Sequence, residues 1–297
     1  MILPSRYIDE VKSIPDSKLS FGVGIYHKLQ GKYTTIGSPG NKPSVVAKSI
    51  KAYLAGDISR TLEGLQDEAD FAIPSCFGEC KEWTSIQFHS KILRVIALLS
   101  GRTFVGLPLC RNEEWIDATI SYTRDANMAV APVNGIYPLL RPFVAPKLPE
   151  VRRIKHHRVN GARLLKPIIL ERLENLKVPG FEPPNDMIQC IIQNSGEKAG
   201  DIHFQCHTQM TLSLASIHTT AMSMTQVMYN LALYPEYQEP LRKELEEVLA
   251  ADNGILTKAG ITKLKKMDSF MRESQRMYPS GVGLFYLFPK SYIVILI

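Results

Sequence analysis

The hydrophobic pattern is most regular between residues 207 and 278, in the last third of the chain. The stretch HTQMTLSLASIHTTAMSMTQVMYNLALY is apolar enough to be buried and contains no helix breaker. It therefore predicts one long helix that stops near Tyr234 and Pro235.

Two shorter helices are predicted after this break. PEYQEPLRKELEEVLA restarts with Pro235 at the first helical position and ends in the turn at residues 251–254. Its apolar residues fall on one helical face, namely Leu241, Leu245, Val248 and Leu249. Asp268 is then the predicted N-cap of a short helix, SFMRESQRMY, which Pro279 ends.

The whole pattern predicts a mainly α protein with a single domain over residues 1–297. Residues 1 to about 80 contain most of the Gly, Pro and Ser clusters that interrupt helices and strands, and they predict short irregular elements with a few turns. KILRVIALLSGRTF and ARLLKPIILERLENLK show helical spacing with polar residues between. At the C-terminal end, the β-branched residues of FYLFPKSYIVILI permit a terminal strand.

Composition indicates a globular protein with a mild basic excess. The 297 residues are 45% hydrophobic, which is ample for a packed core, and the net charge is +6. Most of that excess lies in the basic stretch at residues 152–158, which also contains His156 and His157. Such a stretch is typical of a solvated helix face, and its alternative role is to meet phosphates or an acidic partner. No nucleic-acid partner is predicted.

The cysteines and the apolar segments indicate whether disulfides, a targeting peptide or a membrane span are present. Five scattered cysteines, without a signal peptide or an Asn-x-Ser/Thr sequon, predict free thiols. The N-terminal stretch MILPSRYIDEVKSIPDSKLSF is polar and predicts neither a targeting peptide nor an anchor. Residues 282–297 contain Pro289 and Lys290 and fall short of the roughly 20 residues that cross a bilayer. We expect a soluble or peripherally associated chain.

Seven polar side chains lie in the middle of the predicted long helix. They are Ser213, Ser216, His218, Thr219, Thr220, Ser223 and Thr225. Ser and Thr are mediocre helix formers, and buried hydroxyls need hydrogen-bond partners. In one interpretation each hydroxyl bonds back to the carbonyl one turn earlier, which asks for no function. In the other, this part of the helix faces a pocket, where Thr and His218 serve a ligand or relay a proton. The helix alone favours neither.

Glu273 and Arg276 lie three residues apart on one face of the last predicted helix. Such pairs are common and contribute a few tenths of a kcal/mol. The order of elements is more informative than the pair. A long helix with a mid-helix Thr pair precedes a Pro break, an acidic amphipathic helix, a turn, and a short helix with Glu-x-x-Arg before a Pro.

This order resembles the cytochrome P450 superfamily of haem-thiolate monooxygenases, and in particular its fungal biosynthetic branch. The long central helix of that family carries Ala/Gly-Gly-x-acid-Thr-Thr, and residues 215–220 (ASIHTT) lie in register with it. Glu273 and Arg276 match the family's Glu-x-x-Arg. TFVGLPLCRNEEW and LALYPEYQEPLRKELEEVL also look like stretches of the fungal branch. The resemblance covers the chain up to about Pro279.

The resemblance implies an incomplete cytochrome P450 fold and a role for particular residues. Thr219, with Thr220 and His218 beside it, is implied to help deliver protons during oxygen activation; His218 replaces the usual acid and Ser216 the usual Gly. The Glu-x-x-Arg pair is implied to be structural and to close a charge network with a downstream arginine. An intact relative would use haem, O₂ and electrons from cytochrome P450 reductase to oxidise a small apolar metabolite.

The resemblance also shows what this sequence lacks. The family's haem ligand is the cysteine of a Phe-x-x-Gly-x-Arg-x-Cys-x-Gly loop beyond Glu-x-x-Arg, and no cysteine follows Arg276. The earlier stretch from Phe104 to Cys110 is not such a loop, because Phe is one place too near and Pro108 stands where Arg is needed. Asn112 also replaces the final Gly.

A metal site is not predicted elsewhere. His203, Cys206 and His207 are spaced to share a helical face, but no second pair completes a tetrahedral set. Core packing or capping is the expected role of these residues.

We therefore expect a chain that is truncated before the cysteine loop, has no membrane anchor, and does not activate oxygen. Two alternatives stay open. In one, the chain is a non-catalytic helical binding or regulatory remnant. In the other, it is an incomplete gene model of an active monooxygenase, and the DNA after the codon for Lys290 encodes the loop. The compartment is unknown: the family's usual place is the endoplasmic reticulum membrane, and a chain without an anchor fits the cytoplasm.

Overall fold

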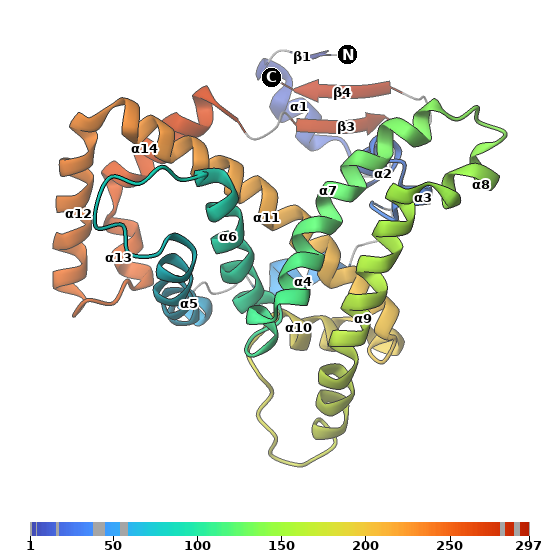
Figure 1. Ribbon diagram of the computed structural model, residues 1–297, viewed down its shortest axis with the longest axis horizontal. Helices are drawn as coiled ribbons and strands as arrows, with labels where there is room; N and C mark the ends of the chain where they lie inside the picture. Colours follow the sequence, from blue (N-terminus) through green and yellow to red (C-terminus); the bar gives the residue numbers. More distant parts are fainter. Residues whose placement is uncertain are drawn as a thin grey trace. The chain divides into compact units, whose positions relative to one another are not determined.

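The computed structural model describes residues 2–3, 5–15, 18–37, 45–53, 59–279, 283–287 and 292–296 (Figure 1). Most of these residues are helical. In chain order, the elements are β1 (Ile2–Leu3), η1 (Ser5–Tyr7), α1 (Ile8–Ser13), β2 (Leu19–Ser20), α2 (Phe21–Lys28), α3 (Gly31–Thr34), α4 (Val45–Tyr53), α5 (Ser59–Phe77), α6 (Phe88–Phe104), η2 (Leu109–Arg111), α7 (Glu113–Gly135), α8 (Arg141–Val144), η3 (Ala145–Lys147), α9 (Pro149–Asn175), α10 (Met187–Asn194), η4 (Gly196–Lys198), α11 (Ile202–Leu233), η5 (Pro235–Tyr237), α12 (Gln238–Ala251), α13 (Lys258–Lys263), α14 (Lys265–Met277), β3 (Gly283–Leu287) and β4 (Tyr292–Leu296).

One small sheet joins the two ends of the chain. Its strand order is β1-β4-β3-β2, with β1 parallel to β4 and the other neighbours antiparallel. The register pairs Phe285 with Val294 in the hairpin of β3 and β4, and Ile2 with Ile295 at the parallel edge. The prediction of a mainly α fold with a small β portion near the N-terminus and at the C-terminal end is confirmed.

The chain groups into two compact units. One unit comprises Met1–Ser44, Ser121–Val159 and Gly281–Ile297 and contains the sheet; the other comprises Val45–Ile120 and Asn160–Ser280. The expectation of a single domain stays a prediction. The candidate site residues at positions 218–220, 273 and 276 all belong to the second unit.

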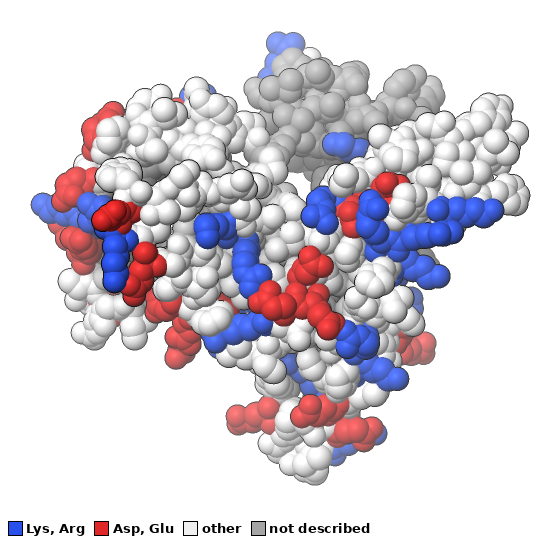
Figure 2. Space-filling model, in the orientation of Figure 1, with Lys and Arg blue, Asp and Glu red and all other residues white. Residues whose placement is uncertain are grey.

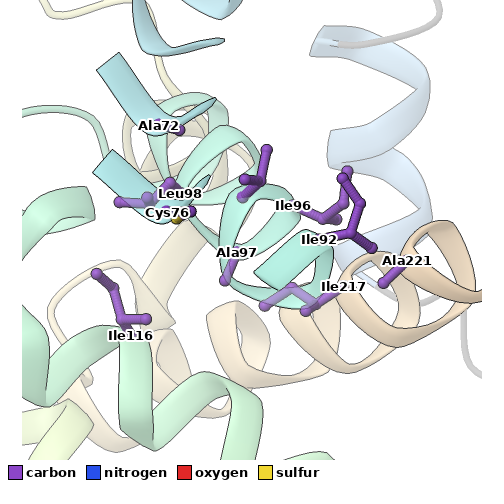
Figure 3. Close-up of a cluster of buried hydrophobic side chains, with 10 residues drawn as sticks. Ala72, Cys76, Ile92, Ile96, Ala97, Leu98, Ile116, Ile217 and Ala221 are labelled. Carbon is purple, nitrogen blue, oxygen red and sulfur yellow. The ribbon is translucent and has the colours of Figure 1, made fainter. Parts of the chain in front are cut away.

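The core of the second unit lies between α5, α6, α7 and α11. Figure 3 shows Ile217 and Ala221 of α11 beside Ile92 and Ile96 of α6. All four side chains are less than 9% exposed. Ile116 of α7 belongs to the same cluster, so the middle of α11 is packed against two helices on one of its sides.

The predicted long helix is confirmed as α11, which begins five residues earlier than the pattern indicated. Asp201 is its N-cap, because the Asp201 Oδ1 accepts a hydrogen bond of 3.0 Å from the Phe204 N–H. The helix ends at Leu233, and the Pro break becomes the short 3₁₀ turn η5.

Two predictions about helices were wrong. Part of the region predicted as irregular is helical, since α4 and the 19-residue α5 lie within residues 45–77. Asp268 does not cap the last helix, because α14 begins three residues earlier, at Lys265. The Glu244 carboxylate of α12 accepts the N–H groups of Lys266 and Met267 at 2.8 and 2.9 Å, so a carboxylate from another helix satisfies donors in the first turn of α14.

The basic stretch lies on α9, within the first unit. Figure 2 shows Lys and Arg side chains gathered over the part of α9 nearest α8. The stretch is not uniformly solvated, because Asp125 of α7 is 2% exposed and contacts both His157 at 2.8 Å and Arg153 at 3.3 Å. Arg152, Lys155 and His156 are exposed.

The sequence predicts no membrane anchor, which in a helical protein would be a helix long and apolar enough to cross a bilayer. Among the described residues, no helix has the length and hydropathy that a membrane span requires. The side chains at positions 280–297, which include the apolar C-terminal window, lie outside the described residues.

Candidate functional site

The middle of α11 presents two different faces. Ile217 is 1% exposed and Ala221 is 0% exposed, and both belong to the core cluster. Ala215, Thr219 and Thr220 are exposed on the other side of the helix. The sequence suggested that this whole span is buried, and for the threonine pair that interpretation was wrong. The threonines face outward because Ile217 and Ala221 fix the opposite side in the core.

Two of the hydroxyls bond back to the helix, as the interpretation without a function expected. The Thr219 Oγ1 donates to the Ala215 carbonyl at 2.6 Å, and the Thr225 Oγ1 donates to the Ala221 carbonyl at 2.7 Å. Each threonine has a single hydroxyl proton, which is therefore committed to the helix backbone. The Thr219 oxygen keeps lone pairs that can accept a further hydrogen bond.

Ser216 and His218 instead make contacts to neighbouring helices. The Ser216 hydroxyl lies 3.0 Å from the Ser100 hydroxyl of α6, and the His218 Nε2 lies 3.0 Å from the Ile120 carbonyl of α7. These two residues are the ones that depart from the family motif. Sequence reasoning missed Ser100, whose signal was an isolated hydroxyl within the apolar run IALLSG.

Glu273 and Arg276 form a bidentate ion pair on α14. The Nε and Nη2 of Arg276 donate to the two Glu273 carboxylate oxygens at 2.8 and 2.7 Å. The side chains are 61% and 66% exposed. The hydrogen bonds from Arg276 lower the pKa of Glu273, and the same contact raises the pKa of Arg276. The pair thus bears little of the desolvation penalty that a buried pair carries.

A groove of about 920 Å³ lies beside this pair, between the end of α11, α12 and α14. Glu273 and Arg276 line it together with several aromatic and apolar side chains, which include Tyr234, Tyr237, Phe270, Met277 and Tyr278. The exposed Thr219 does not line this groove. The two candidate sites are therefore separate features of the second unit.

All five cysteines are free, as predicted, and four of them are buried. Cys110 is 0% exposed, and burial, together with the Glu68 carboxylate, raises the pKa of its thiol to about 11. Burial also raises the pKa of Cys190. Cys80 is exposed, and its Sγ contacts the Phe77 carbonyl at 3.8 Å. The burial of Cys110 and Cys190 favours a protonated thiol over the thiolate that a metal requires.

The metal candidates of the sequence are not brought together as a site. Cys206 is 2% exposed, whereas His203 is exposed on the same helix. Across the part of the chain that the structure describes, no group of three His, Cys, Asp or Glu side chains is arranged to hold a metal ion.

A partly buried ion pair between Glu68 and Arg111, which sequence reasoning missed, stabilises the same unit. Glu68 is 0% exposed and accepts two hydrogen bonds from the Arg111 Nε and one of 3.0 Å from its Nη2. The Arg111 guanidinium also lies 3.7 Å from the ring centroid of Phe71. Because all these residues belong to α5 and η2, the contact joins two elements of the second unit and is structural.

Comparison with known proteins gives a consistent result. A family model described as Cytochrome P450 matches residues 92–285. Cytochrome P450 monooxygenase BOA4 of Botryotinia fuckeliana is 40% identical over 279 residues, which are 94% of this chain and 56% of that protein. Cytochrome P450 monooxygenase ascG of Acremonium egyptiacum is 37% identical over 296 residues, covering 94% of this chain and 55% of that protein.

A solved structure supports the fold. The retinoic acid bound cyanobacterial CYP120A1 aligns with a TM-score of 0.70 over 99% of this chain and 66% of that chain, at 14% identity. At this identity the likeness concerns the fold alone. The chain spans about half the length of the curated relatives that it matches.

Proposed function

Because this chain belongs to the cytochrome P450 family and its relatives are fungal monooxygenases, we propose that it is a monooxygenase-like chain of fungal secondary metabolism. The family binds haem, receives electrons from a reductase and oxidises an organic substrate. For the complete enzyme we propose a small apolar metabolite as substrate and cytochrome P450 reductase as partner. The supporting observation is the match over residues 92–285, which spans both α11 and α14.

Within this proposal, Thr219 and Thr220 line the side of the haem pocket on which O₂ binds in the complete enzyme. Their exposure on α11 leaves them open to a group that packs against this face. The Thr219 oxygen accepts a hydrogen bond readily, because its own proton is donated to the Ala215 carbonyl. Glu273 and Arg276 support the fold as an ion pair and do not touch the reacting atoms.

The residues present do not supply an axial ligand for the haem iron. A haem-thiolate site requires an accessible cysteine thiolate. Four of the five cysteines are buried, and Cys110 among them has a raised thiol pKa. Cys80 is exposed, but it lies outside any stretch that resembles the family's cysteine loop. His218 does not substitute, since its Nε2 is held at the Ile120 carbonyl. We therefore derive no catalytic step for this chain and propose that, expressed by itself, it is inactive.

The test is spectroscopic. The purified 297-residue chain, expressed with haem supply, is reduced and exposed to carbon monoxide. The proposal expects no Soret band typical of thiolate-ligated haem. Such a band, in a variant that lacks Cys80 as well as in the parent chain, would overturn the inactive assignment.

One observation favours a second candidate, a non-catalytic helical binding or regulatory protein. Such a role requires a fold that is stable without further segments, and the ion pair of α14 does not oppose that stability because it is exposed. The core around Ile217 is also closed by α5, α6, α7 and α11. Cooperative thermal unfolding of the purified chain supports this candidate, and insoluble or molten material excludes it.

A further inference from the structure

Burial of Ile217 and Ala221 directs one side of α11 to the core, but hydrophobicity alone does not account for the rotation of the helix. Met222, Tyr229 and Leu233 are 48%, 50% and 68% exposed, whereas Ser213 and Thr225 are only 3% and 8% exposed. Helices with a single apolar stripe take their rotation from that stripe. In α11 some large apolar side chains lie outside while some hydroxyls lie inside, so another type of contact must help to fix the rotation of the helix.

Three directional polar contacts of 3.0 Å connect the middle of α11 to its neighbours. Nearer the start of the helix, the Gln209 Nε2 donates to the Phe104 carbonyl of α6 at 3.4 Å. On α6, His89 and Ser100 contact Thr225 and Ser216, each at 3.0 Å. Because the Thr225 proton is donated to the Ala221 carbonyl, the His89 Nδ1–H is the donor to the Thr225 oxygen. The two contacts follow the antiparallel pairing of α6 and α11 and hold one side of α11 to α6.

The third contact holds α11 to α7. A carbonyl oxygen only accepts hydrogen bonds, so the His218 Nε2–H is the donor to the Ile120 carbonyl, at 3.0 Å. This donor is present in the neutral Nε2–H tautomer and in the imidazolium form alike. A carboxylate at this position has no proton to donate, and therefore the contact depends on the histidine.

The Ser216 and His218 contacts occur within one turn of the helix, and the Thr225 contact lies about two turns further on. Successive helical side chains are separated by about 100°. Ser216 reaches α6, Ile217 enters the core, and His218 reaches α7. Thr219 and Thr220 follow and are the ones left on the open side.

We infer that His218 is a positioning residue, which together with Ser216 sets the rotation of α11 and so presents Thr219 and Thr220 on the open face. It acts through the Ile120 carbonyl and is not a proton donor of the relay that the motif register suggested. The role of the exposed Thr219 in the complete enzyme rests on the proposed function. The positioning of α11 by His218 does not rest on it and is measured without haem.

The experiment reads the rotation from one added cysteine at a time, beside the four native cysteines that are buried. In a Cys80→Ser background, Thr220→Cys reports the open face and Ile217→Cys reports the core, and the rate of maleimide labelling of the folded chain is measured for each. The ratio of the two rates is high when α11 has the rotation described above. The reporters are combined with His218→Leu, which removes the donor, and with His218→Gln, which restores an N–H at the end of a side chain of similar reach. His203→Leu makes the same chemical change at an exposed position of α11 and is the matched control.

His218→Leu is expected to lower the labelling ratio severalfold, while His218→Gln and His203→Leu keep the parent ratio. An unchanged ratio in His218→Leu, or an equal fall in His203→Leu, overturns the inference. If His218→Leu does not give folded protein, Ser100→Ala carries the same test because it removes one hydroxyl and leaves the histidine in place. There a lowered ratio supports positioning by polar contacts, and an unchanged ratio contradicts it. A haem spectrum that disproves the proposed function would leave these labelling results unaffected.

Discussion

Two helix N-caps of equal geometry allow the contribution of a buried ion pair to be isolated. Asp186 caps α10 and Asp201 caps α11, each through a hydrogen bond of 3.0 Å from a backbone N–H three residues later. Asp201 is exposed. Asp186 is 5% exposed and also accepts two hydrogen bonds from Arg172, which is itself 8% exposed. We consider the replacement of each aspartate by alanine.

The expected losses follow from these contacts. Asp201→Ala removes only a cap and lowers the free energy of unfolding by about 1 kcal/mol. Asp186→Ala removes a cap and also leaves a buried guanidinium without its carboxylate, which costs a further 3–5 kcal/mol or so. The total loss for Asp186→Ala is therefore about 4–6 kcal/mol. Changing Arg172 to Met in the Asp186→Ala background removes the unpaired charge and is expected to recover part of that loss.

Urea denaturation followed by circular dichroism measures these differences, with the free energy obtained from the midpoint and the slope of each transition. The reasoning is refuted if Asp186→Ala and Asp201→Ala destabilise the chain equally. It is also refuted if the Arg172→Met change makes Asp186→Ala less stable, because the guanidinium would then contribute to stability without its partner.

Four further predictions follow from burial and ionisation. Ile217→Ala, at a position 1% exposed, is expected to lower the free energy of unfolding by about 2–5 kcal/mol, and Met222→Ala, at 48% exposed, by less than about 0.5 kcal/mol, as urea denaturation checks. Burial raises the pKa of the Cys110 thiol to about 11 from an ordinary 9.0, so as the pH rises this thiol ionises in the unfolded chain before it does in the folded one. The contribution of Cys110 to the free energy of unfolding is therefore fully present below about pH 9 and is lost as the pH rises toward 11. Urea midpoints across that range should decline less in Cys110→Ala than in the parent chain. Under native conditions at neutral pH a thiol reagent should modify Cys80 and spare Cys110, and early modification of Cys110 by mass spectrometry would contradict its burial. Glu273→Gln should leave the midpoint of thermal unfolding almost unchanged, since the pair with Arg276 is exposed; a drop in the midpoint that persists at high salt would show that the pair is buried in solution.

The sequence predicted the helices whose ends carry strong local signals. The long helix α11 and the break after it were anticipated because Pro235 interrupts an unbroken apolar pattern. The region around α5 was missed, because turn residues earlier in the chain outweighed its helical spacing. Asp268 was misassigned as a cap since the true partner of the first turn of α14 is Glu244, a residue 22 positions away that leaves no local trace.

The resemblance selected the candidate site residues, whose role stays a prediction, but it did not indicate their contacts. The resemblance of residues 215–220 to the family motif placed Thr219 and Thr220 correctly on one turn of α11, but burial of a helix side depends on which neighbours cover it. His218 illustrates the difference. Its position in the motif suggested a proton relay, whereas the Ile120 carbonyl, 98 residues earlier in the chain, determines where its ring lies. Likewise, Arg172 and Asp186 are 14 residues apart and showed no pattern by which to pair them.

The central claim combines a cytochrome P450 fold with the proposal that the 297-residue chain, expressed by itself, forms no thiolate-ligated haem. The most direct measurement is the carbon monoxide difference spectrum of the reduced 297-residue chain, expressed with haem supply beside a full-length fungal relative as positive control. The account predicts the thiolate-type Soret band for the relative and its absence for this chain. The same band in this chain, at a stoichiometry near one haem per protein, would contradict the account.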